Sequence, residues 1–364
     1  MTNPDPLLEM RNLAVTFPVD DGPDVRAVES VDLTLHEGEV HGLVGESGSG
    51  KSVTARAILQ LLDDARVTAS ELTFESVNLL TQSEEEMRSV RGAEIGMIFQ
   101  DSLSALNPVM TVGEQIAEVV RHHTNTGEST GTLSELRRKY VTGTDETSAS
   151  WERSVELLDM VGIPDASTRA NEYPHQLSGG QRQRVMIAQA LAGDPSIIIA
   201  DEPTTALDVT VEADILAELR DLCDDFDVSV LLITHDLGVV AETCDRVTVM
   251  YSGSVMEKGL TDSIFTHPSH PYTEGLLQSI PEYSLISNDS ELQTTPGSAP
   301  DPRDRPNGCP FRDRCPIAFD ACSEPLPTHS ITDDHIIRCH DYARDRTEDV
   351  SSKYQETQEI EVSE

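Results

Sequence analysis

The segment GESGSGKS at residues 45–52 constrains the fold of this chain more than any other part of its sequence. It matches the pattern G-x-x-x-x-G-K-[ST], which is typical of a phosphate-binding loop between a buried strand and a helix. The flanks agree, because an apolar run at residues 40–44 precedes the loop and apolar residues at helical spacing follow it over residues 53–62. An ordinary Gly/Ser turn would need neither flank. The sequence therefore predicts an α/β fold with a phosphate-binding loop.

Each part of this loop has a chemical role in the prediction. Glycines allow successive backbone N–H groups to converge on a phosphate, and the start of the following helix adds positive potential. Lys51, one of only four lysines in the chain, would reach the β- and γ-phosphates, and the Ser52 hydroxyl would bind Mg²⁺. The loop residues expected to bind the nucleotide are Gly45, Glu46, Ser47, Gly48, Ser49, Gly50, Lys51 and Ser52.

Two adjacent acids end another apolar run. Residues 196–200 read as a buried parallel strand, and Asp201 and Glu202 follow directly. Adjacent side chains on a strand point in opposite directions, so the two acids can do different work. Asp201 suits binding of Mg²⁺, and Glu202 suits polarising the water that attacks a γ-phosphate. For this pair alone, a solvated turn is the alternative.

Further segments stand in a fixed order around these two. They are LSGGQ (Leu177, Ser178, Gly179, Gly180 and Gln181), Gln100 after residues 96–99, Asp208 in the sequence Ala-Leu-Asp, His235 after residues 231–234, and the aromatic Phe17. Taken singly they have simpler explanations: LSGGQ is also a capped helix start, and a lone Gln or His is usually a surface residue. Taken together with the loop and the acid pair, they resemble the ATP-binding-cassette (ABC) ATPases over residues 7–260.

This resemblance implies a fold and a mechanism. The expected fold is a P-loop, RecA-like ABC nucleotide-binding domain with an antiparallel β subdomain and a helical subdomain. Two such ATPases would close head to tail, so that residues 178–181 of one face the nucleotide held by the other. Leu177 and Asp208, the latter in the D-loop, are also expected to bind nucleotide, and Phe17 would stack on adenine. Ser52, Gln100 and Asp201 would hold Mg²⁺. The implied catalytic residues are Glu202, which acts on water, His235, which contacts the γ-phosphate, and Lys51.

Changes in amino-acid composition and pattern along the sequence predict three regions. Residues 1–262 are assigned to the ABC ATPase domain, with its helical subdomain at about 101–190 and a polar surface insertion at 124–149. Residues 263–346, rich in Pro, His and Cys, form a C-terminal extension. Residues 347–364 are expected to be a disordered acidic tail.

The extension narrows the resemblance to the ATPases of oligopeptide and dipeptide importers. HPSHPYT at residues 267–273 and the segment FQD followed by ALNP at residues 99–108 are similar to that subfamily. The implied function is ATP hydrolysis that energises peptide import at the cytoplasmic face of the membrane. The implied partners are two membrane permease subunits bound near residues 101–175, a paralogous second ATPase and an extracytoplasmic solute-binding protein. The alternatives are an importer for nickel or another small solute, and a soluble ABC protein outside transport.

Four cysteines of the extension form a separate candidate site. Cys309, Cys315, Cys322 and Cys339 have the spacing C-x5-C-x6-C-x16-C amid prolines and glycine. Thiolates are soft ligands for Zn or an iron–sulfur cluster. The wide spacing and the similar cysteine set of the peptide-importer group favour [4Fe–4S] over Zn, and a site without metal is the third alternative.

The charge of the chain excludes one class of partner. Its 65 acidic residues against 26 basic ones give a net charge of −39, which would repel nucleic-acid phosphates. The acids are spread along the whole sequence, which predicts a solvated surface adapted to a high-salt cytoplasm. No apolar run approaches the roughly 20 residues of a membrane span, and the N-terminus lacks the pattern of a signal peptide. We therefore expect a peripheral protein that reaches the membrane through its partners.

Overall fold

The computed structural model describes residues 5–100, 102–124, 126, 145–204, 209–280 and 297–344 of the chain. The strands are β1 (Leu8–Phe17), β2 (Val25–Leu35), β3 (Val40–Val44), β4 (Arg66–Thr68), β5 (Glu71–Phe74), β6 (Val77–Asn78), β7 (Ile95–Ile98), β8 (Ile197–Asp201), β9 (Ser229–Thr234), β10 (Arg246–Tyr251), β11 (Ser254–Leu260), β12 (His329–Thr332) and β13 (His335–Ile337). The α-helices are α1 (Lys51–Ile58), α2 (Glu84–Ser89), α3 (Ser102–Ala105), α4 (Val112–His123), α6 (Ala149–Met160), α7 (Ala166–Arg169), α8 (Gly179–Leu191), α9 (Val209–Phe226), α10 (Leu237–Thr243), α11 (Thr261–Thr266), α12 (Pro271–Leu277) and α14 (Asp341–Arg344). Short 3-10 or π turns are η1 (Leu79–Thr81), η2 (Val90–Glu94), η4 (Pro174–Gln176) and η5 (Asp320–Ser323).

The centre of the fold is a mixed sheet in the order β12-β13-β11-β10-β3-β9-β8-β7. The strands from β10 to β7 in this order are parallel, and β11, β13 and β12 pair antiparallel at one edge. β3, β8 and β9 are buried along their whole length, as their continuous apolar runs predict. Because these strands are parallel, their carboxyl ends lie on the same side of the sheet, and the loops that follow them lie close together there.

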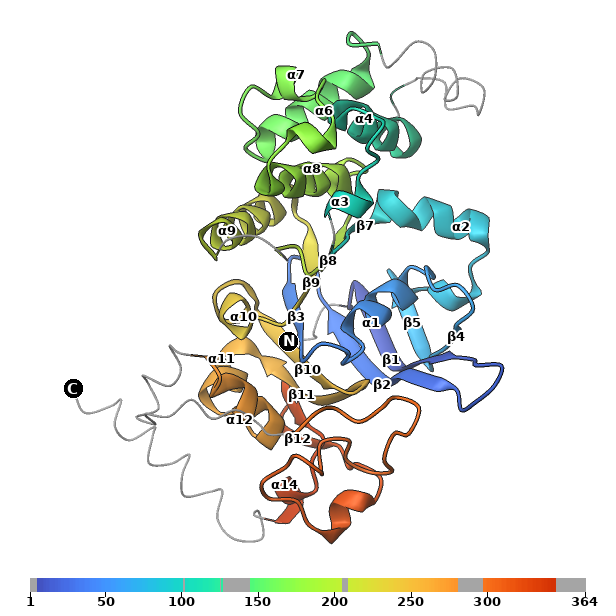
Figure 1. Cartoon of the computed structure of the whole chain (residues 1–364), viewed down its shortest axis with the longest axis vertical. Helices are drawn as coiled ribbons and strands as arrows, with labels where there is room; N and C mark the ends of the chain where they lie inside the picture. The colour runs from blue at the N-terminus through green and yellow to red at the C-terminus, as the bar shows by residue number, and fades with distance from the viewer. Residues whose placement is uncertain are drawn as a thin grey trace, which may run out of the picture.

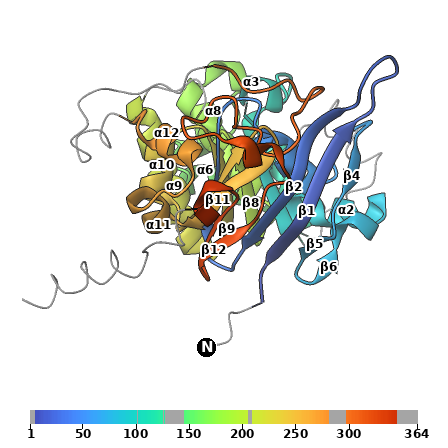
Figure 2. The same ribbon diagram turned by 90° about the horizontal axis from the view of Figure 1, so that it is seen from below.

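A second sheet has the order β2-β1-β5-β6, with β4 also paired to β1. All its pairings are antiparallel, and the turn at residues 18–24 closes the β1–β2 hairpin. This is the antiparallel β subdomain that the family resemblance implies. Figures 1 and 2 show it beside α1, along one side of the central sheet.

Alternation of side chains along the central strands builds two cores. Leu43, Ile199 and Ile233 face the antiparallel sheet and α1, and they join one cluster with the buried residues of β1 and β2. Their neighbours Val44 and Ile198 belong to the other cluster, which contains residues of α4, α6, α8 and α9. The central sheet is therefore covered on both faces, as a parallel sheet requires.

Helices α4, α6, α7 and α8 form a separate layer at the top of Figure 1. Among the described helices before α8, α4 and α6 are the longer ones, each of 12 residues. Of the predicted insertion at residues 124–149, only residues 124, 126 and 145–149 are among the described residues. The predicted acidic tail at 347–364 lies outside them.

The C-terminal extension packs directly against the domain formed by the preceding residues. Strand β13 pairs with β11, so the extension continues the central sheet at its edge. α12 contacts β11, and the described residues 297–344 lie at the lower end of the molecule in Figure 1. Within the described ranges, no helix is both long and apolar enough to cross a bilayer.

The predicted end of the helix after the phosphate loop was wrong. The helix after the phosphate loop ends at Ile58, whereas the apolar spacing extended it to residue 62. Gln60 adopts a left-handed backbone conformation with φ +51°, and this stops the helix although Leu61 and Leu62 keep the helical period. Strand β2 begins at Val25 and pairs along the full length of β1.

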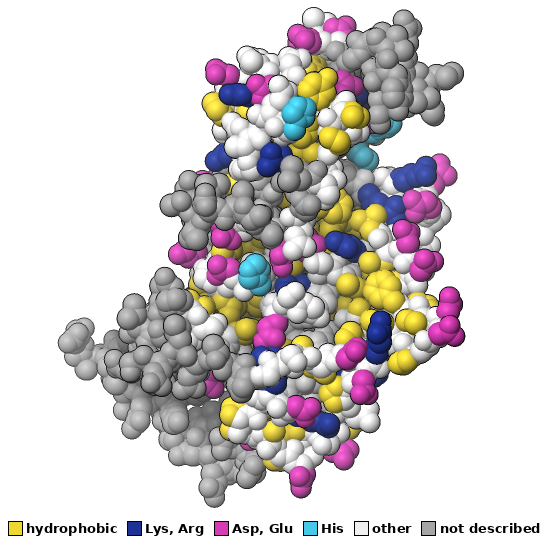
Figure 3. Space-filling model, in the orientation of Figure 1, with side chains coloured by type: hydrophobic (Ala, Val, Ile, Leu, Met, Phe, Trp, Pro, Cys, Tyr) yellow, Lys and Arg dark blue, Asp and Glu magenta, His cyan; other side chains and the backbone are white. Residues whose placement is uncertain are grey.

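Acidic side chains are not gathered in one place on the face of the molecule that Figure 3 shows. Figure 3 shows Asp and Glu side chains scattered over the visible face with Lys and Arg between them. This distribution agrees with a solvated acidic surface and not with a single acidic site.

Candidate functional site

The loop at residues 45–52 joins β3 to α1 and depends on glycine. Gly45, Gly48 and Gly50 have φ values of +149°, +78° and +98°, which L-residues rarely adopt. A Cβ on Gly45 would lie 2.0 Å from the Met250 carbonyl oxygen, and one on Gly50 would lie 2.7 Å from the Ala27 carbonyl oxygen. The backbone of neighbouring strands thus closes around the loop and sets its shape.

Lys51 lies inside this loop. Its side chain is nearly covered, with the residue 5% exposed, and its ammonium donates to the Gly45 and Glu46 carbonyl oxygens at 2.7 and 3.1 Å. Burial lowers the pKa of the ammonium, while the carboxylates of Glu202, Asp201 and Glu46 act in the opposite direction. A buried cation held by carbonyl oxygens is suited to an anionic ligand such as a phosphate.

Ser52 and Asp201 meet beside the loop. The Ser52 hydroxyl donates to Asp201 Oδ1 at 2.7 Å across 149 residues of sequence. Asp201 is fully buried. Among the described residues its Oδ2 has no hydrogen-bond partner, and Arg56 Nη2 lies 4.0 Å from it. Burial raises the pKa of this carboxyl group, and the Ser52 hydrogen bond lowers it. A buried carboxylate oxygen with an adjacent hydroxyl is the oxygen donor set that Mg²⁺ prefers, so these residues fit the predicted cation.

Glu202 lies between Gln100 and His235. Gln100 Nε2 donates to Glu202 Oε2 at 2.7 Å, and His235 Nδ1 lies 3.6 Å from Glu202 Oε1. These residues follow the carboxyl ends of β7, β8 and β9, so the parallel sheet brings them together. Glu202 has φ +47°, and its N–H donates to the Ile233 carbonyl oxygen, which holds the carboxylate in place. The His235 side chain is 66% exposed and faces open solvent.

The structure does not bring residues 177–181 to this cluster. Ser178 caps the start of α8, where its hydroxyl accepts from the Gln181 N–H at 3.3 Å and its own N–H donates to the Gln181 side chain at 3.0 Å. Figure 1 places α8 in the helical layer. Within the described part of the chain, no hydrogen bond or ion pair joins residues 177–181 to residues 45–52. Phe17 ends β1 and packs partly buried against the second core, and Asp208 lies outside the described residues.

The fold gathers the four cysteines of the extension as free thiols. The Cys309 N–H donates to the Cys322 carbonyl oxygen at 2.9 Å. Burial and the neighbouring Cys339, Cys322 and Cys315 raise the pKa of the Cys309 thiol to about 12. Among the described residues, however, no group of three or more His, Cys, Asp or Glu side chains is arranged to hold a metal ion. The structure therefore gives no support to the predicted iron–sulfur or zinc site.

Sequence reasoning missed two residues that contact the phosphate loop from the extension. Arg314 Nη1 donates to Glu46 Oε2 at 2.8 Å, and the Glu46 N–H donates to the Tyr272 hydroxyl at 3.0 Å. The partners are 268 and 226 residues apart in sequence, so no local pattern could have paired them. The available signal was an arginine next to Cys315 in a chain that is poor in basic residues.

Comparison with known proteins identifies the family. The family model described as ABC transporter matches residues 28–205, and that of the oligopeptide/dipeptide transporter C-terminal region matches residues 256–322. The dipeptide transport ATP-binding protein DppD of Bacillus subtilis is 45% identical over 336 residues, 92% of this chain and 94% of DppD. The chain belongs to the ABC transporter ATP-binding family. It is therefore an ABC-type ATPase.

Other relatives and solved structures agree. The oligopeptide transport ATP-binding protein OppD of Salmonella typhimurium is 44% identical over 333 residues, 92% of this ABC ATPase and 93% of OppD. The structure of the ATP-binding cassette MJ0796 as a dimer with ADP and Pi matches at a TM-score of 0.57 and 27% identity, over 70% of this chain and 98% of that one. The predicted P-loop ABC fold is thereby confirmed.

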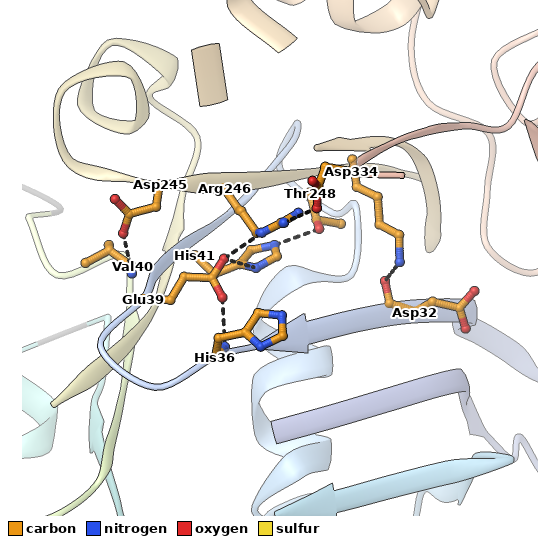
Figure 4. Close-up of polar contacts among 10 residues, drawn as sticks. Asp32, His36, Glu39, Val40, His41, Asp245, Arg246, Thr248 and Asp334 are labelled. Carbon is orange, nitrogen blue, oxygen red and sulfur yellow. Dashed lines mark hydrogen bonds and ion pairs between the residues drawn. The ribbon is translucent and has the colours of Figure 1, made fainter. Parts of the chain in front are cut away.

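A second polar cluster of this ABC ATPase lies near the amino ends of β3 and β10 (Figure 4). Glu39 is buried there; its carboxylate accepts from the His36 N–H at 2.7 Å and lies 3.1 Å from Arg246 Nε, and Arg246 also pairs with Asp334. His41 Nε2 contacts the Thr248 hydroxyl at 2.8 Å. A cavity of about 380 Å³ opens beside these residues. Burial raises the pKa of Glu39 from 4.5 to about 6 and lowers that of His41 to about 3.

Glu39→Gln is expected to stabilise the fold at neutral pH. A carboxyl group whose pKa is higher in the folded state contributes stability at low pH, which is lost as the pH rises from 4.5 to about 6. Glutamine resembles the protonated form, so the variant should gain about 1–2 kcal/mol at pH 8, and the gain should shrink toward pH 5. Chemical denaturation of the wild type and the variant at several pH values between 5 and 8 measures this difference in the free energy of unfolding. Glu37→Gln, an exposed neighbour, is the control, and a gain that does not depend on pH would contradict the assignment.

Proposed function

We propose that residues 45–52 bind the phosphates of ATP and that Ser52, Asp201 and Gln100 hold Mg²⁺. The support is the buried ammonium of Lys51 within the loop and the buried Asp201 oxygen, which has no hydrogen-bond partner in the described part of the chain. Mg²⁺ bound there would neutralise charge on the phosphate oxygens. The loop backbone and Lys51 orient the triphosphate, and most of the catalytic effect comes from this positioning.

Glu202 acts on the attacking water in this proposal. The water oxygen forms a bond to the γ-phosphorus, its proton passes to the Glu202 carboxylate, and the bond to the bridging oxygen breaks to leave ADP. The observation that carries the proposal is the placement of Glu202 between Gln100 and His235 at 2.7 and 3.6 Å. Gln100 orients the carboxylate, and the exposed His235 is free to contact the γ-phosphate.

The remaining motif residues act between two subunits. The capped start of α8 presents N–H groups and positive helix potential, which suit a γ-phosphate from outside this chain. Residues 177–181 and Asp208 would therefore face the nucleotide of a second ATPase, and Phe17 would stack on adenine. The separation of α8 from this chain's own loop supports such an arrangement.

The transporter energised by this ATPase imports peptides in our proposal. The support is the alignment with DppD and OppD, whose names assign dipeptide and oligopeptide transport and which align over 92% of this chain. Its partners would be two permease subunits, a paralogous ATPase and an extracytoplasmic solute-binding protein, with the chain on the cytoplasmic face of the membrane. We place the domain limits at 1–262 and 263–346.

Purification of the chain from native membranes tests this proposal. Permeases and a second ATPase should co-purify, and a strain lacking the chain should lose uptake of labelled di- and oligopeptides. Loss of nickel uptake alone would support the alternative importer, and a chain that purifies without permeases would exclude transport. Measuring activity from dilute buffer to molar salt tests adaptation to high salt, which an optimum in dilute buffer would contradict.

An apolar surface near the start of α4 is proposed to bind a permease. Val109 and Tyr173 are exposed there, and the Val112 N–H donates to the Glu172 carbonyl oxygen, which places Tyr173 beside α4. Exposed apolar side chains grouped on one layer are typical of an interaction surface.

Val109→Asp is expected to separate the chain from the membrane. Val109 is 74% exposed, so the fold should tolerate the charge, whereas an apolar interface would not. The membrane-bound fraction and peptide uptake should fall about tenfold or more, as for a hot-spot residue, while ATP binding by the purified chain is unchanged. Val77→Asp, at a 46% exposed position in the antiparallel sheet, is the control. Equal membrane binding of the two variants would contradict this surface.

A [4Fe–4S] cluster on Cys309, Cys315, Cys322 and Cys339 is proposed from the family resemblance, with Zn or no metal as alternatives. Its support is that all four are free thiols in one region of the extension. Metal analysis of an anaerobic preparation, beside a variant with Cys309 and Cys315 replaced by serine, tests it. A preparation that contains zinc in place of iron, or neither metal, would contradict the proposed [4Fe–4S] cluster.

A further inference from the structure

Residues of the C-terminal extension contact the phosphate loop directly. Arg314, which directly precedes Cys315, donates to Glu46 Oε2 at 2.8 Å, and Tyr272 of α12 accepts from the Glu46 N–H at 3.0 Å. Glu46 is the second residue of the loop and follows Gly45, whose carbonyl oxygen binds Lys51. Both the side chain and the backbone of one loop residue are thus anchored by the extension.

A buried aromatic cluster fixes the arginine. The rings of Tyr251, Tyr272 and Phe311 are buried, with centroids 4.7 to 5.3 Å apart. The Arg314 guanidinium lies 5.5 Å from the Tyr251 ring and 5.8 Å from the Phe311 ring, and it donates to the Tyr251 hydroxyl at 3.1 Å. Its side chain is 8% exposed, so the ion pair with Glu46 is partly shielded from water. A planar guanidinium stacked on rings keeps one orientation, which a lysine would not.

The charge of Glu46 is what makes this contact relevant to ATP. The Glu46 carbonyl oxygen lies 3.1 Å from Lys51 Nζ, and the Glu46 carboxylate acts electrostatically on that ammonium. Without Arg314, the Glu46 carboxylate would lose its ion pair while it lies in the loop that has to accept a triphosphate. Like charges at such a site weaken binding.

We propose that Arg314 is a positioning residue for ATP binding: it neutralises Glu46 and holds the phosphate loop in the shape that receives the phosphates. The proposal rests on the assignment of residues 45–52 to ATP. It gives the extension a role in the ATPase reaction, since the segment that carries Cys309 and Cys315 also carries this arginine.

The test is a charge-matched pair of variants in the full-length chain, assembled with its permeases and second ATPase. Arg314→Ala should raise the KM for ATP roughly tenfold and change kcat less than about twofold, because an uncompensated carboxylate weakens binding before the chemical step. Arg314→Lys should give an intermediate KM. Arg312→Ala, in the same loop but paired with Asp313, should leave both constants unchanged.

The decisive comparison repeats Arg314→Ala in a Glu46→Gln background. Removing the carboxylate should abolish most of the KM penalty, which a purely structural role would not allow. An equal penalty in both backgrounds, no change in KM, or a loss confined to kcat would each overturn the proposal. If Arg314→Ala does not fold, Arg314→Lys with and without Glu46→Gln carries the same comparison. Lys51→Ala tests the assignment of residues 45–52 to ATP separately from the role of Arg314. An unchanged KM for ATP in this variant would refute that assignment, whatever the Arg314 variants show.

Discussion

Replacing Glu202 with glutamine is expected to slow ATP hydrolysis by about 10²- to 10⁴-fold, the range for loss of a general base, while ATP stays bound. Glutamine keeps the size of the side chain and can still accept the Gln100 hydrogen bond, but it cannot take a proton from water. The loop and Lys51 are untouched, so binding should persist. Single-turnover hydrolysis and equilibrium ATP binding by the assembled transporter measure the two effects separately.

Glu242→Gln is the matched control. Glu242 is an exposed glutamate on α10, the helix that follows β9 and His235, and the same substitution there should leave hydrolysis unchanged. Hydrolysis at the native rate in Glu202→Gln would remove the catalytic role. Loss of ATP binding along with hydrolysis would assign Glu202 to the binding site instead.

Lys51→Met is expected to abolish the stabilisation of the protein by ATP without weakening the protein itself. Burial lowers the pKa of this ammonium, which means that its charge costs stability when no phosphate is bound. Methionine removes that cost, so the free energy of unfolding without ATP should be equal or higher. With ATP at one hundred times its Kd, the wild type should gain about 2.7 kcal/mol, and the variant should gain none.

Lys258→Met provides the comparison. Lys258 is another mostly buried lysine, but it donates to the Asp32 carbonyl oxygen and not to the loop. Its variant should keep the full gain from ATP. Thermal or chemical unfolding with and without ATP gives both values, and a full gain in Lys51→Met would contradict the predicted phosphate contact.

Short-range features of this protein were predictable from the sequence. The phosphate loop needs glycine at the positions where φ is positive, and the buried strands β3, β8 and β9 need continuous apolar runs, so local residue types record both. The end of α1 shows the limit of such reasoning. Leu61 and Leu62 keep the helical period, yet the left-handed conformation of Gln60 ends the helix at Ile58.

The cysteines show a different limit. Their spacing predicted a metal site, since thiolates are good ligands, but ligand type says nothing about how side chains point. The structure gathers Cys309 and Cys322 through a backbone hydrogen bond without a metal-holding arrangement of three or more ligands in the described ranges. Only tertiary geometry distinguishes a cluster of cysteines from a metal site.

By itself, the sequence of GESGSGKS between a strand and a helix determined the α/β fold and the phosphate loop, because a strand, a tight turn and a helix start are local structures. The tertiary structure decided which distant residues surround that loop. Ser52 meets Asp201 across 149 residues, Gln100 meets Glu202 across 102, and Glu46 meets Arg314 across 268. These pairs depend on how the buried faces of the sheets and the extension pack together. Packing is a property of the whole chain that no local pattern records.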